Sequence, residues 1–184
     1  MSFQMTVGIR VDGIVGPVTQ KALDDPNAPV YKIPKSNAVP ATGTAQEMDW
    51  FKSNISKIFA KGVVATITDV ATGLAWNEKR RGGANHADVE PCTAADTAIL
   101  KTAYGNRWSW DRRAIFVTIN GINYAASMNG MPHSGQSITD NNFPGHHCIH
   151  FTNSRTHNTN SVCKNHQKMV KKAASTVLGD NSVG

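Results

Sequence analysis

The sequence predicts a β-rich α+β domain with flanking helices, and three observations lead to this fold class. Runs rich in β-branched residues, such as 63–68 (VVATIT), have the composition of strands. Asn120-Gly121 stands between two apolar runs and is the strongest short hairpin signal in the chain. Apolar residues in 48–59 and 165–178 recur at helical spacing, so short amphipathic helices should flank the strands.

The remaining elements follow from the same patterns. Thr93-Ala94-Ala95-Asp96 is a variant of the capping box and should begin a helix that runs to about Tyr104. The last helix has an apolar face formed by Met169, Val170, Ala173 and Val177, with its lysines on the other face. The expected strands are 63–68, a strand around 74–76, the hairpin strands 114–119 and 122–127, and a short strand at 148–151.

A separate motif precedes this domain. Residues 11–23, VDGIVGPVTQKAL, place two glycines around a tight turn and Pro17 at the first position of a helix that should run to about Leu23. The run resembles the closing segment of the small three-helix peptidoglycan-binding module of many wall hydrolases, whose signature is VDGxxGPxTxxAL. A lone turn and helix cannot bury a core, so we expect residues 1–25 to be a partial module without independent wall binding.

A linker and a catalytic domain should follow this partial module. Residues 26–46 hold four prolines among Ala, Thr, Ser and Asn, which is typical of an extended linker. The catalytic domain should then span residues 47–184. Of the whole chain, 40% is hydrophobic and 17% charged, which allows a packed core.

The chain carries a formal net charge of +6, which favours anionic partners. A cell wall with phosphate polymers and stem-peptide carboxylates is one such partner. We do not expect nucleic acid, because no zinc finger, RNP aromatic motif or basic helix is visible. No apolar run is long enough to cross a bilayer, and the N-terminus has neither the basic leader nor the apolar stretch of a signal peptide.

The cysteines Cys92, Cys148 and Cys163 are widely and irregularly spaced, which supports neither a disulfide framework nor a structural zinc site. We expect Cys92 and Cys163 to be small, buried or half-buried residues. Cys148 differs because it lies in the sequence His146-His147-Cys148-Ile149-His150. Since alternate residues of a strand share a face, His146 and His150 should lie on the same side as Cys148.

This cluster predicts a cysteine nucleophile. A cysteine reacts as its thiolate, which a neighbouring imidazole stabilises as an ion pair. His133, in Met131-Pro132-His133-Ser134-Gly135, is returned toward Cys148 by the intervening polar loop and can serve as the general base.

The pattern resembles the catalytic motif of the L,D-transpeptidases, in which a histidine–glycine pair is followed, after a loop of similar length, by S/T-H-G-C-x-R. His133 matches the first histidine, His146 the histidine two positions before the nucleophile, and Cys148 the nucleophile. The resemblance covers roughly residues 114–151. It implies a β-rich L,D-transpeptidase-like catalytic domain that needs no cofactor.

The resemblance also implies the role of each matching residue. Cys148 attacks the carbonyl of a bond between an L-centre and a D-centre in a peptidoglycan stem peptide and forms a thioester. His133 takes the thiol proton and later activates the acceptor, and it is oriented through the backbone carbonyl of Ser134. His146 shapes the site beside the developing oxyanion. An amine acceptor gives a cross-link and water gives hydrolysis, so transpeptidase and carboxypeptidase activities both stay open.

The sequence departs from the family motif at four positions. Ser134 replaces the glycine after the first histidine, Gly145 the Ser or Thr, and His147 the glycine before the nucleophile. His150 stands where the family has an arginine, whose two-pronged grip on a carboxylate a histidine cannot reproduce. We therefore assign His150 to substrate binding.

A second polar cluster, His86-Ala87-Asp88-Val89-Glu90, has three interpretations. We assign His86 and Asp88 to substrate binding without a metal. Alternatively, they join histidines of the first cluster around zinc in a zinc-dependent wall peptidase, although the HExxH motif is missing. In the third interpretation the cluster is a hydrogen-bonded loop that caps the helix at Thr93. For His157 and His166 we expect surface positions.

The sequence therefore predicts a cysteine-dependent enzyme of bacterial peptidoglycan. We expect an extracellular or cell-wall location, which the protein would also reach if it were released by cell lysis, as phage lysins are. The alternatives are a peptidoglycan hydrolase or lysin, including the zinc peptidase, and a non-catalytic wall-binding module whose histidines only bind ligand.

Overall fold

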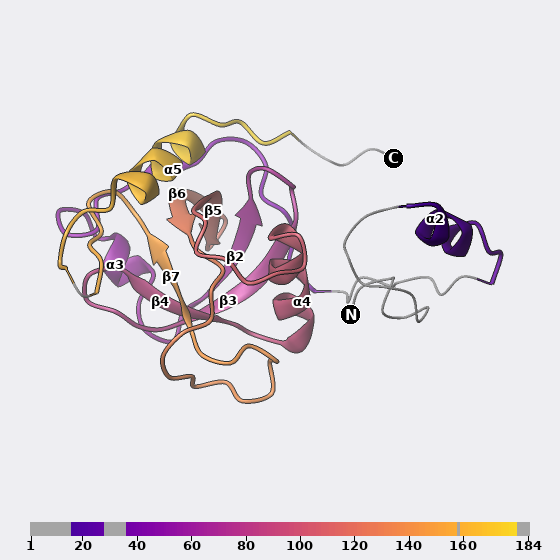
Figure 1. The fold of residues 1–184 in the computed structure, drawn as a ribbon. Helices are drawn as coiled ribbons and strands as arrows, with labels where there is room; N and C mark the ends of the chain where they lie inside the picture. The colour runs from indigo at the N-terminus through magenta and orange to yellow at the C-terminus, as the bar shows by residue number, and fades with distance from the viewer. Residues whose placement is uncertain (1–15, 28–35, 158, 180–184) are drawn as a thin grey trace. The chain divides into compact units, whose positions relative to one another are not determined.

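The computed structural model describes residues 16–27, 36–157 and 159–179, in two compact units that comprise residues 1–33 and 34–184. In the first unit, helix α2 (Pro17–Leu23) begins with Pro17 in its first turn, as the sequence predicts (Figure 1). Residues 11–15 of the wall-module motif lie outside the described residues. No described helix is long and apolar enough to cross a membrane.

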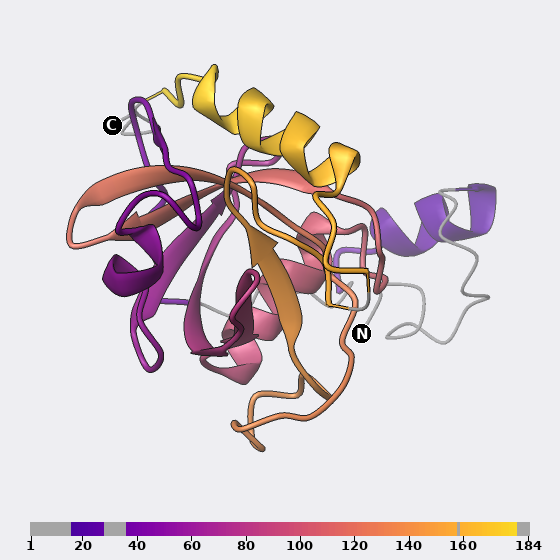
Figure 2. The same ribbon diagram turned by 90° about the vertical axis from the view of Figure 1, so that its left-hand side faces the viewer.

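The second unit contains an antiparallel barrel (Figures 1 and 2). Its strand order is β6-β5-β2-β3-β4-β7, and β7 pairs back with β6 through Ser127↔His150 and Met128↔Ile149, which closes the barrel. A short strand β1 adds to β6 in parallel at Tyr124 and Ala125. The bounds are β1 Gln46–Glu47, β2 Val64–Asp69, β3 Ala75–Gly82, β4 Ala87–Pro91, β5 Arg113–Ile119, β6 Ile122–Met128 and β7 His147–His150. The β-rich class with flanking helices is thus confirmed.

The β5–β6 hairpin forms where the sequence predicts it. Asn120 and Gly121 adopt positive φ values of 50° and 77°, as the two-residue type I′ turn requires. The turn sets the register that pairs Ile119 with Ile122 and, at the far end, Arg113 with Met128. That register delivers the end of β6 to β7, where the barrel closes.

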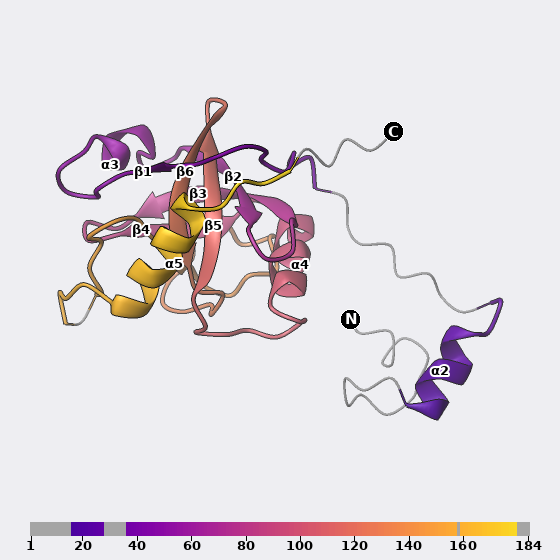
Figure 3. The ribbon, with the colours of Figure 1, turned by 90° about the horizontal axis from the view of Figure 1, so that it is seen from above.

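Three helices flank the barrel, as Figure 3 shows from above. Helix α4 (Ala94–Ala103) is capped by Thr93, whose hydroxyl accepts from the Asp96 amide, as predicted. Helix α5 (Lys164–Ala174) packs on β5 and β6 and buries Val170 and Ala173. The third, α3, is only Ile55–Ile58, shorter than the predicted helix at 48–59.

Two predicted segments differ in the structure for local reasons. The Asp49 carboxylate accepts hydrogen bonds from the amides of Phe51 and Lys52, so the chain turns there instead of forming helix. Val177 lies beyond the end of α5 and is 69% exposed, so it is not part of the apolar face.

The second half of the predicted linker belongs to the folded unit. Ala41 and Ala45 contact the small apolar cluster beneath α5, and Gly43 forms an antiparallel bridge with Leu178. Ser36 donates a hydrogen bond to the Asp96 carboxylate at 2.5 Å. Residues 36–46 are therefore packed chain and not a free spacer.

The pairing of β4 with β7 decides which side chains form the site. Ala87 pairs with Ile149 and Val89 with His147, and these four side chains are fully buried on the inner side of the pair. Asp88 pairs with Cys148 between them, so both point to the outer face. Burying an apolar side chain such as Ile149 contributes about 1.5–3 kcal/mol, which holds this register against a one-residue slip.

The loop interpretation of residues 86–90 is wrong, because Ala87–Pro91 is strand β4. Its sequence alternates polar His86, Asp88 and Glu90 with small or β-branched Ala87 and Val89. This is the period-two pattern of a strand with one face in the core. The three polar residues concealed it because they read as a hydrophilic loop.

Candidate active site

A cavity of about 850 Å³ lies over the outer face of β4 and β7. The rest of its lining comes from Arg81 and Gly82 of β3, Trp110 and Arg112 before β5, Asn129, His133, Ser134 and His146 between β6 and β7, Thr156, His157 and Thr159, and His166 of α5. All the site residues predicted from the sequence line this cavity: Cys148, His133, His146, Ser134, His150, His86 and Asp88. The alternation predicted for 146–150 also holds, because His147 and Ile149 are absent from the lining.

Cys148 and His133 form a thiol–imidazole pair. Cys148 Sγ lies 3.5 Å from His133 Nε2, and Cys148 is 4% exposed. His133 Nδ1 donates to the Met131 carbonyl at 2.8 Å, which leaves Nε2 free to accept a proton from the thiol. Burial, with further contributions from neighbouring imidazoles, lowers the pKa of His133, so the ring is neutral at pH 7.

The carbonyl that orients His133 belongs to Met131, not to Ser134 as the family resemblance implied. Ser134 is exposed and has a positive φ of 56°. At this φ the chain turns away after His133, so the Ser134 carbonyl does not contact the His133 ring. The Met131 carbonyl, two residues before His133, does.

A backbone bridge fixes His133 beside Cys148. The His133 amide donates to the His146 carbonyl at 2.9 Å, and the His146 amide donates to the His133 carbonyl at 3.0 Å. Gly145, with φ 133°, makes this approach possible, since a Cβ there would lie 2.7 Å from the His133 carbonyl oxygen. The Ser or Thr of the family motif would not fit at this position.

The loop after His133 is tied to strand β4 by Glu90. The buried Glu90 carboxylate accepts hydrogen bonds from the amides of Ser137 and Ile138 at 2.8 and 2.7 Å, and it forms an ion pair with Arg81. Arg81 also donates to the Gly135 carbonyl at 2.6 Å. This loop is thereby held over the site by the strand that carries Asp88.

His146 faces both parts of the site. Its Nδ1 lies 2.8 Å from the Gly135 carbonyl oxygen and 2.9 Å from Arg81 Nη1. Its Nε2 is buried, lies 3.8 Å from Asp88 Oδ1, and has no hydrogen-bond partner among the described residues. That nitrogen is available to a ligand.

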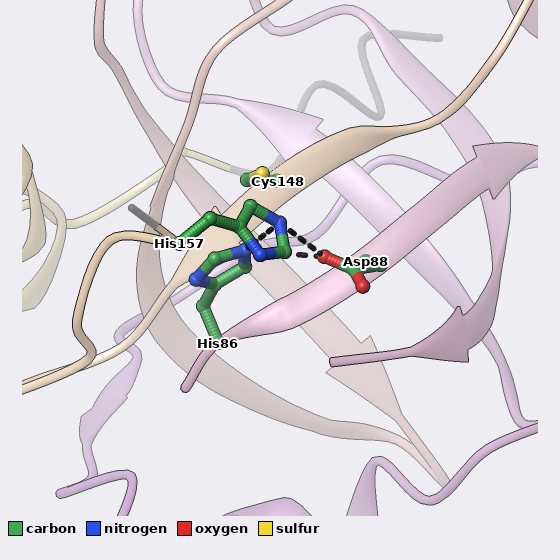
Figure 4. A group of neighbouring side chains, drawn as sticks. All are labelled: His86, Asp88, Cys148 and His157. Carbon is green, nitrogen blue, oxygen red and sulfur yellow. Dashed lines mark hydrogen bonds and ion pairs between the residues drawn. The ribbon is translucent and has the colours of Figure 1, made fainter. Parts of the chain in front are cut away.

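On the other side of Cys148, two histidines converge on one carboxylate (Figure 4). Asp88 Oδ1 lies 3.1 Å from His86 Nε2 and 3.2 Å from His157 Nε2. Burial alone would lower the pKa of His86, but its contacts with Asp88, with Cys148 and with the Arg155 carbonyl raise it to about 10. Burial opposes ionisation of Asp88 as well, yet the surrounding imidazoles hold the pKa of this carboxyl below its usual value.

His150 and His166 stack in parallel with ring centres 3.8 Å apart. Burial, reinforced by the neighbouring cationic and imidazole groups, lowers the pKa of His166 to about 3 and that of His150 still further. The surface position expected for His166 is wrong, because its helix packs on β6 and its Nδ1 lies 2.8 Å from Ser127 Oγ. His150 therefore faces the cavity as a neutral ring and not as a cation.

Sequence reasoning missed the arginines of this cavity. Arg112 lines it, donates through Nη1 to the Trp110 carbonyl, and has a buried Nε without a hydrogen-bond partner among the described residues. Arg81 lines it beside His146. Arg112 provides the positive charge that His150 lacks, whereas the charge of Arg81 is paired with Glu90. No spacing in the sequence identifies them, because only the folded barrel brings β3 and the start of β5 to the same cavity.

His157 was also missed as a site residue. Its side chain is 48% exposed, in line with the surface position expected for it, but its ring nitrogen points at Asp88. His147, by contrast, belongs to the core, where its Nε2 lies 2.7 Å from Glu78 Oε1. Comparisons of the chain with protein-family models, with curated proteins and with solved structures found no match, so the chemistry rests on the residues themselves.

Proposed function

We propose that this protein is a cysteine acyltransferase that acts on peptidoglycan stem peptides, of the L,D-transpeptidase or L,D-carboxypeptidase type. The observation that carries the proposal is the pair of Cys148 Sγ and His133 Nε2 at 3.5 Å, with His133 Nδ1 bonded to the Met131 carbonyl. Nucleophile, base and orienting group are the three parts that thiol acyl transfer needs.

The proposed reaction has two stages. The thiol proton passes to His133 Nε2 while Sγ attacks the peptide carbonyl, and collapse of the tetrahedral intermediate expels the amine, which takes that proton. The resulting thioester on Cys148 is then attacked by an amine or by water, with His133 again accepting the proton. An amine regenerates the thiol and forms a cross-link, and water regenerates it and trims the stem.

A guanidinium in the cavity supports a substrate with carboxylates. Arg112 lines the cavity and has a buried Nε with no partner among the described residues, whereas the Arg81 guanidinium beside His146 is already paired with Glu90. A guanidinium binds a carboxylate through paired hydrogen bonds. Stem peptides carry such groups, and the wall-module motif at residues 11–23 points to the same polymer.

The test is a muropeptide mass profile after incubation with the wild-type protein and with Cys148→Ala, each with and without a chelator. New cross-links or trimmed stems that vanish with Cys148→Ala and persist in chelator support the proposal. Cys163→Ala is the matched control, since this half-buried cysteine precedes α5 and is not in the lining of the cavity. A carbapenem thioester, seen as a mass shift on Cys148, would support the L,D-transpeptidase type in particular.

Activity that survives Cys148→Ala and disappears in chelator would overturn the proposal in favour of the zinc peptidase. If the wild-type protein, with its Cys148 thiol intact, changes no muropeptide, the proposal is overturned in favour of a wall-binding module.

A further inference from the structure

Three atoms that can bind a metal lie beside Cys148 Sγ, within about 3 Å of one another. His86 Nε2 and His157 Nε2 lie 2.9 Å apart, and each lies within 3.2 Å of Asp88 Oδ1. Cys148 Sγ is within 4.8 Å of all three atoms. Figure 4 shows the imidazoles turned toward the carboxylate, with the thiol above them.

The orientation of His86 makes this convergence unfavourable for neutral rings. Its Nδ1 donates to the Arg155 carbonyl at 2.6 Å, so in the neutral ring Nε2 carries a lone pair and no proton. That lone pair faces a carboxylate oxygen and a second imidazole nitrogen. Asp88 Oδ1 is itself buried and makes no hydrogen bond to the described residues. A neutral His157 with its proton on Nε2 can donate to only one of the other two atoms, whereas a cation held among the three atoms would satisfy all of them.

The donor types at this position suit a soft divalent cation. Two imidazoles, one thiolate and one carboxylate are zinc ligands, whereas calcium and magnesium take oxygen ligands. Zinc binds nitrogen at about 2.0–2.1 Å in a tetrahedron, which places two such nitrogens roughly 3.3 Å apart. The present separations need to widen by a few tenths of an ångström, and the exposed His157 can supply that movement. Zinc-binding histidines commonly donate their other ring N–H to a carboxylate or backbone carbonyl, and His86 Nδ1 makes such a bond to the Arg155 carbonyl.

We propose that His86 Nε2, Asp88 Oδ1, His157 Nε2 and Cys148 Sγ bind one zinc ion. The site stands on its own donors and goes beyond the proposed acyl transfer. Where that function holds, zinc competes with it, because a thiolate that ligates zinc is not available to attack a carbonyl. The metal-bound protein is then the resting form and the metal-free protein the reactive one.

The test is a cobalt titration of the full chain after metal removal, because cobalt reports both geometry and sulfur ligation in its absorption spectrum. We expect a 1:1 complex with intense tetrahedral bands and a thiolate-to-cobalt charge-transfer band, both removed by an equivalent of zinc. Cys148→Ser should lose the charge-transfer band, whereas the matched control Cys163→Ser should keep it. His157→Ala should weaken cobalt binding by more than about 100-fold, since loss of a residue that only hydrogen-bonds to a metal ligand already lowers metal affinity by about 10–100-fold. The circular dichroism of each variant confirms that it is folded.

Absence of a cobalt complex, a charge-transfer band that persists in Cys148→Ser, or unchanged affinity in His157→Ala would each overturn the site. The rate at which iodoacetamide alkylates Cys148, measured by mass spectrometry, tests the zinc site independently of the proposed acyl transfer. Zinc should slow alkylation of the wild-type protein at least 10-fold, whether or not the metal-free protein processes muropeptides, and equal rates with and without zinc would contradict the site.

Discussion

Cys148 lies between two histidines, and only one of them, His86, lies against a carboxylate. His133, at 3.5 Å from the thiol, is oriented by a neutral backbone carbonyl, and burial lowers its pKa. His86 is more deeply buried, yet its contacts with Asp88 and Cys148 raise its pKa to about 10. The same residue type is thus a neutral proton acceptor on one side of the sulfur and a cation or metal ligand on the other. The carboxylate, and not burial, decides which.

The largest effect is expected when Cys148 Sγ, which contacts the histidines on both sides, is removed. Cys148→Ala should reduce acyl transfer by at least about 10⁴-fold, because removal of a nucleophile leaves only binding and oxyanion stabilisation. The rate of muropeptide conversion measures this. Retention of more than a tenth of the activity would show that neither histidine acts through the sulfur.

His133→Gln tests the neutral side. The glutamine amide can occupy the position but cannot accept the thiol proton, so kcat/KM should fall by roughly 10²–10⁴-fold. In metal-free buffer His157→Ala should have a much smaller effect, since it alters only the carboxylate side. Equal losses in the two variants would contradict the division of roles between the two sides.

Gly145→Ala tests how the neutral side is positioned. The added methyl would lie 2.7 Å from the His133 carbonyl oxygen, at a φ of 133° that L-residues rarely adopt. We expect the bridge to open, with a loss of about 1–3 kcal/mol in unfolding free energy and roughly 100-fold in kcat. Urea unfolding and steady-state kinetics measure the two effects. The control is Gly62→Ala, also at positive φ (91°) but with no atom within 4 Å of the added carbon and far from the site in the sequence; it should lose stability without the same loss of kcat.

Arg112→Gln probes the charge that faces the substrate. Loss of a hydrogen bond between two charged groups costs about 1.5–3 kcal/mol, so KM for a stem with a free carboxylate should rise by at least roughly 10-fold. An amidated stem of the same sequence is the matched control and should be affected much less. The same rise in KM for both stems would exclude a carboxylate contact.

The last prediction concerns stability alone and the histidines that have no carboxylate beside them. Since the folded-state pKa of His166 is about 3, against an unfolded value near 6.5, the unfolded chain binds more protons across this interval. Stability should therefore fall as the pH drops from about 6.5 toward 3, by at most about 1.4 kcal/mol per pH unit for this residue. Chemical unfolding at several pH values measures the slope. His166→Gln cannot titrate and should make the dependence shallower, and an unchanged slope would show that His166 ionises freely.

What the sequence could predict follows from the range of the interactions involved. The Asn120-Gly121 turn, the Thr93 cap and the shared face of His146, Cys148 and His150 depend on residues a few positions apart, and all three were predicted. The pairing of Asp88 with Cys148 joins strands about 60 residues apart, and no local pattern encodes it.

The residues that were missed follow the same rule. Arg112 and His157 enter the site only because the barrel closes and places the residues around 112 and 157 along the same cavity. His166 was expected at the surface, but its ring packs against β6 through Ser127. The metal alternative was set aside because the sequence has no known ligand spacing. His86 and His157 are 71 positions apart, which no short motif would reveal.

Barrel closure has a consequence for how activity is lost on denaturation. Strand β7 is only four residues long, and both of its edges are paired, to β4 and to β6. A strand this short has no stability of its own, so its neighbours hold the nucleophile in position. Catalytic activity should then be a reporter of the whole barrel: it should disappear at the same denaturant concentration as the β-sheet signal, and the amide hydrogens of β7 should exchange as slowly as those of the long hairpin.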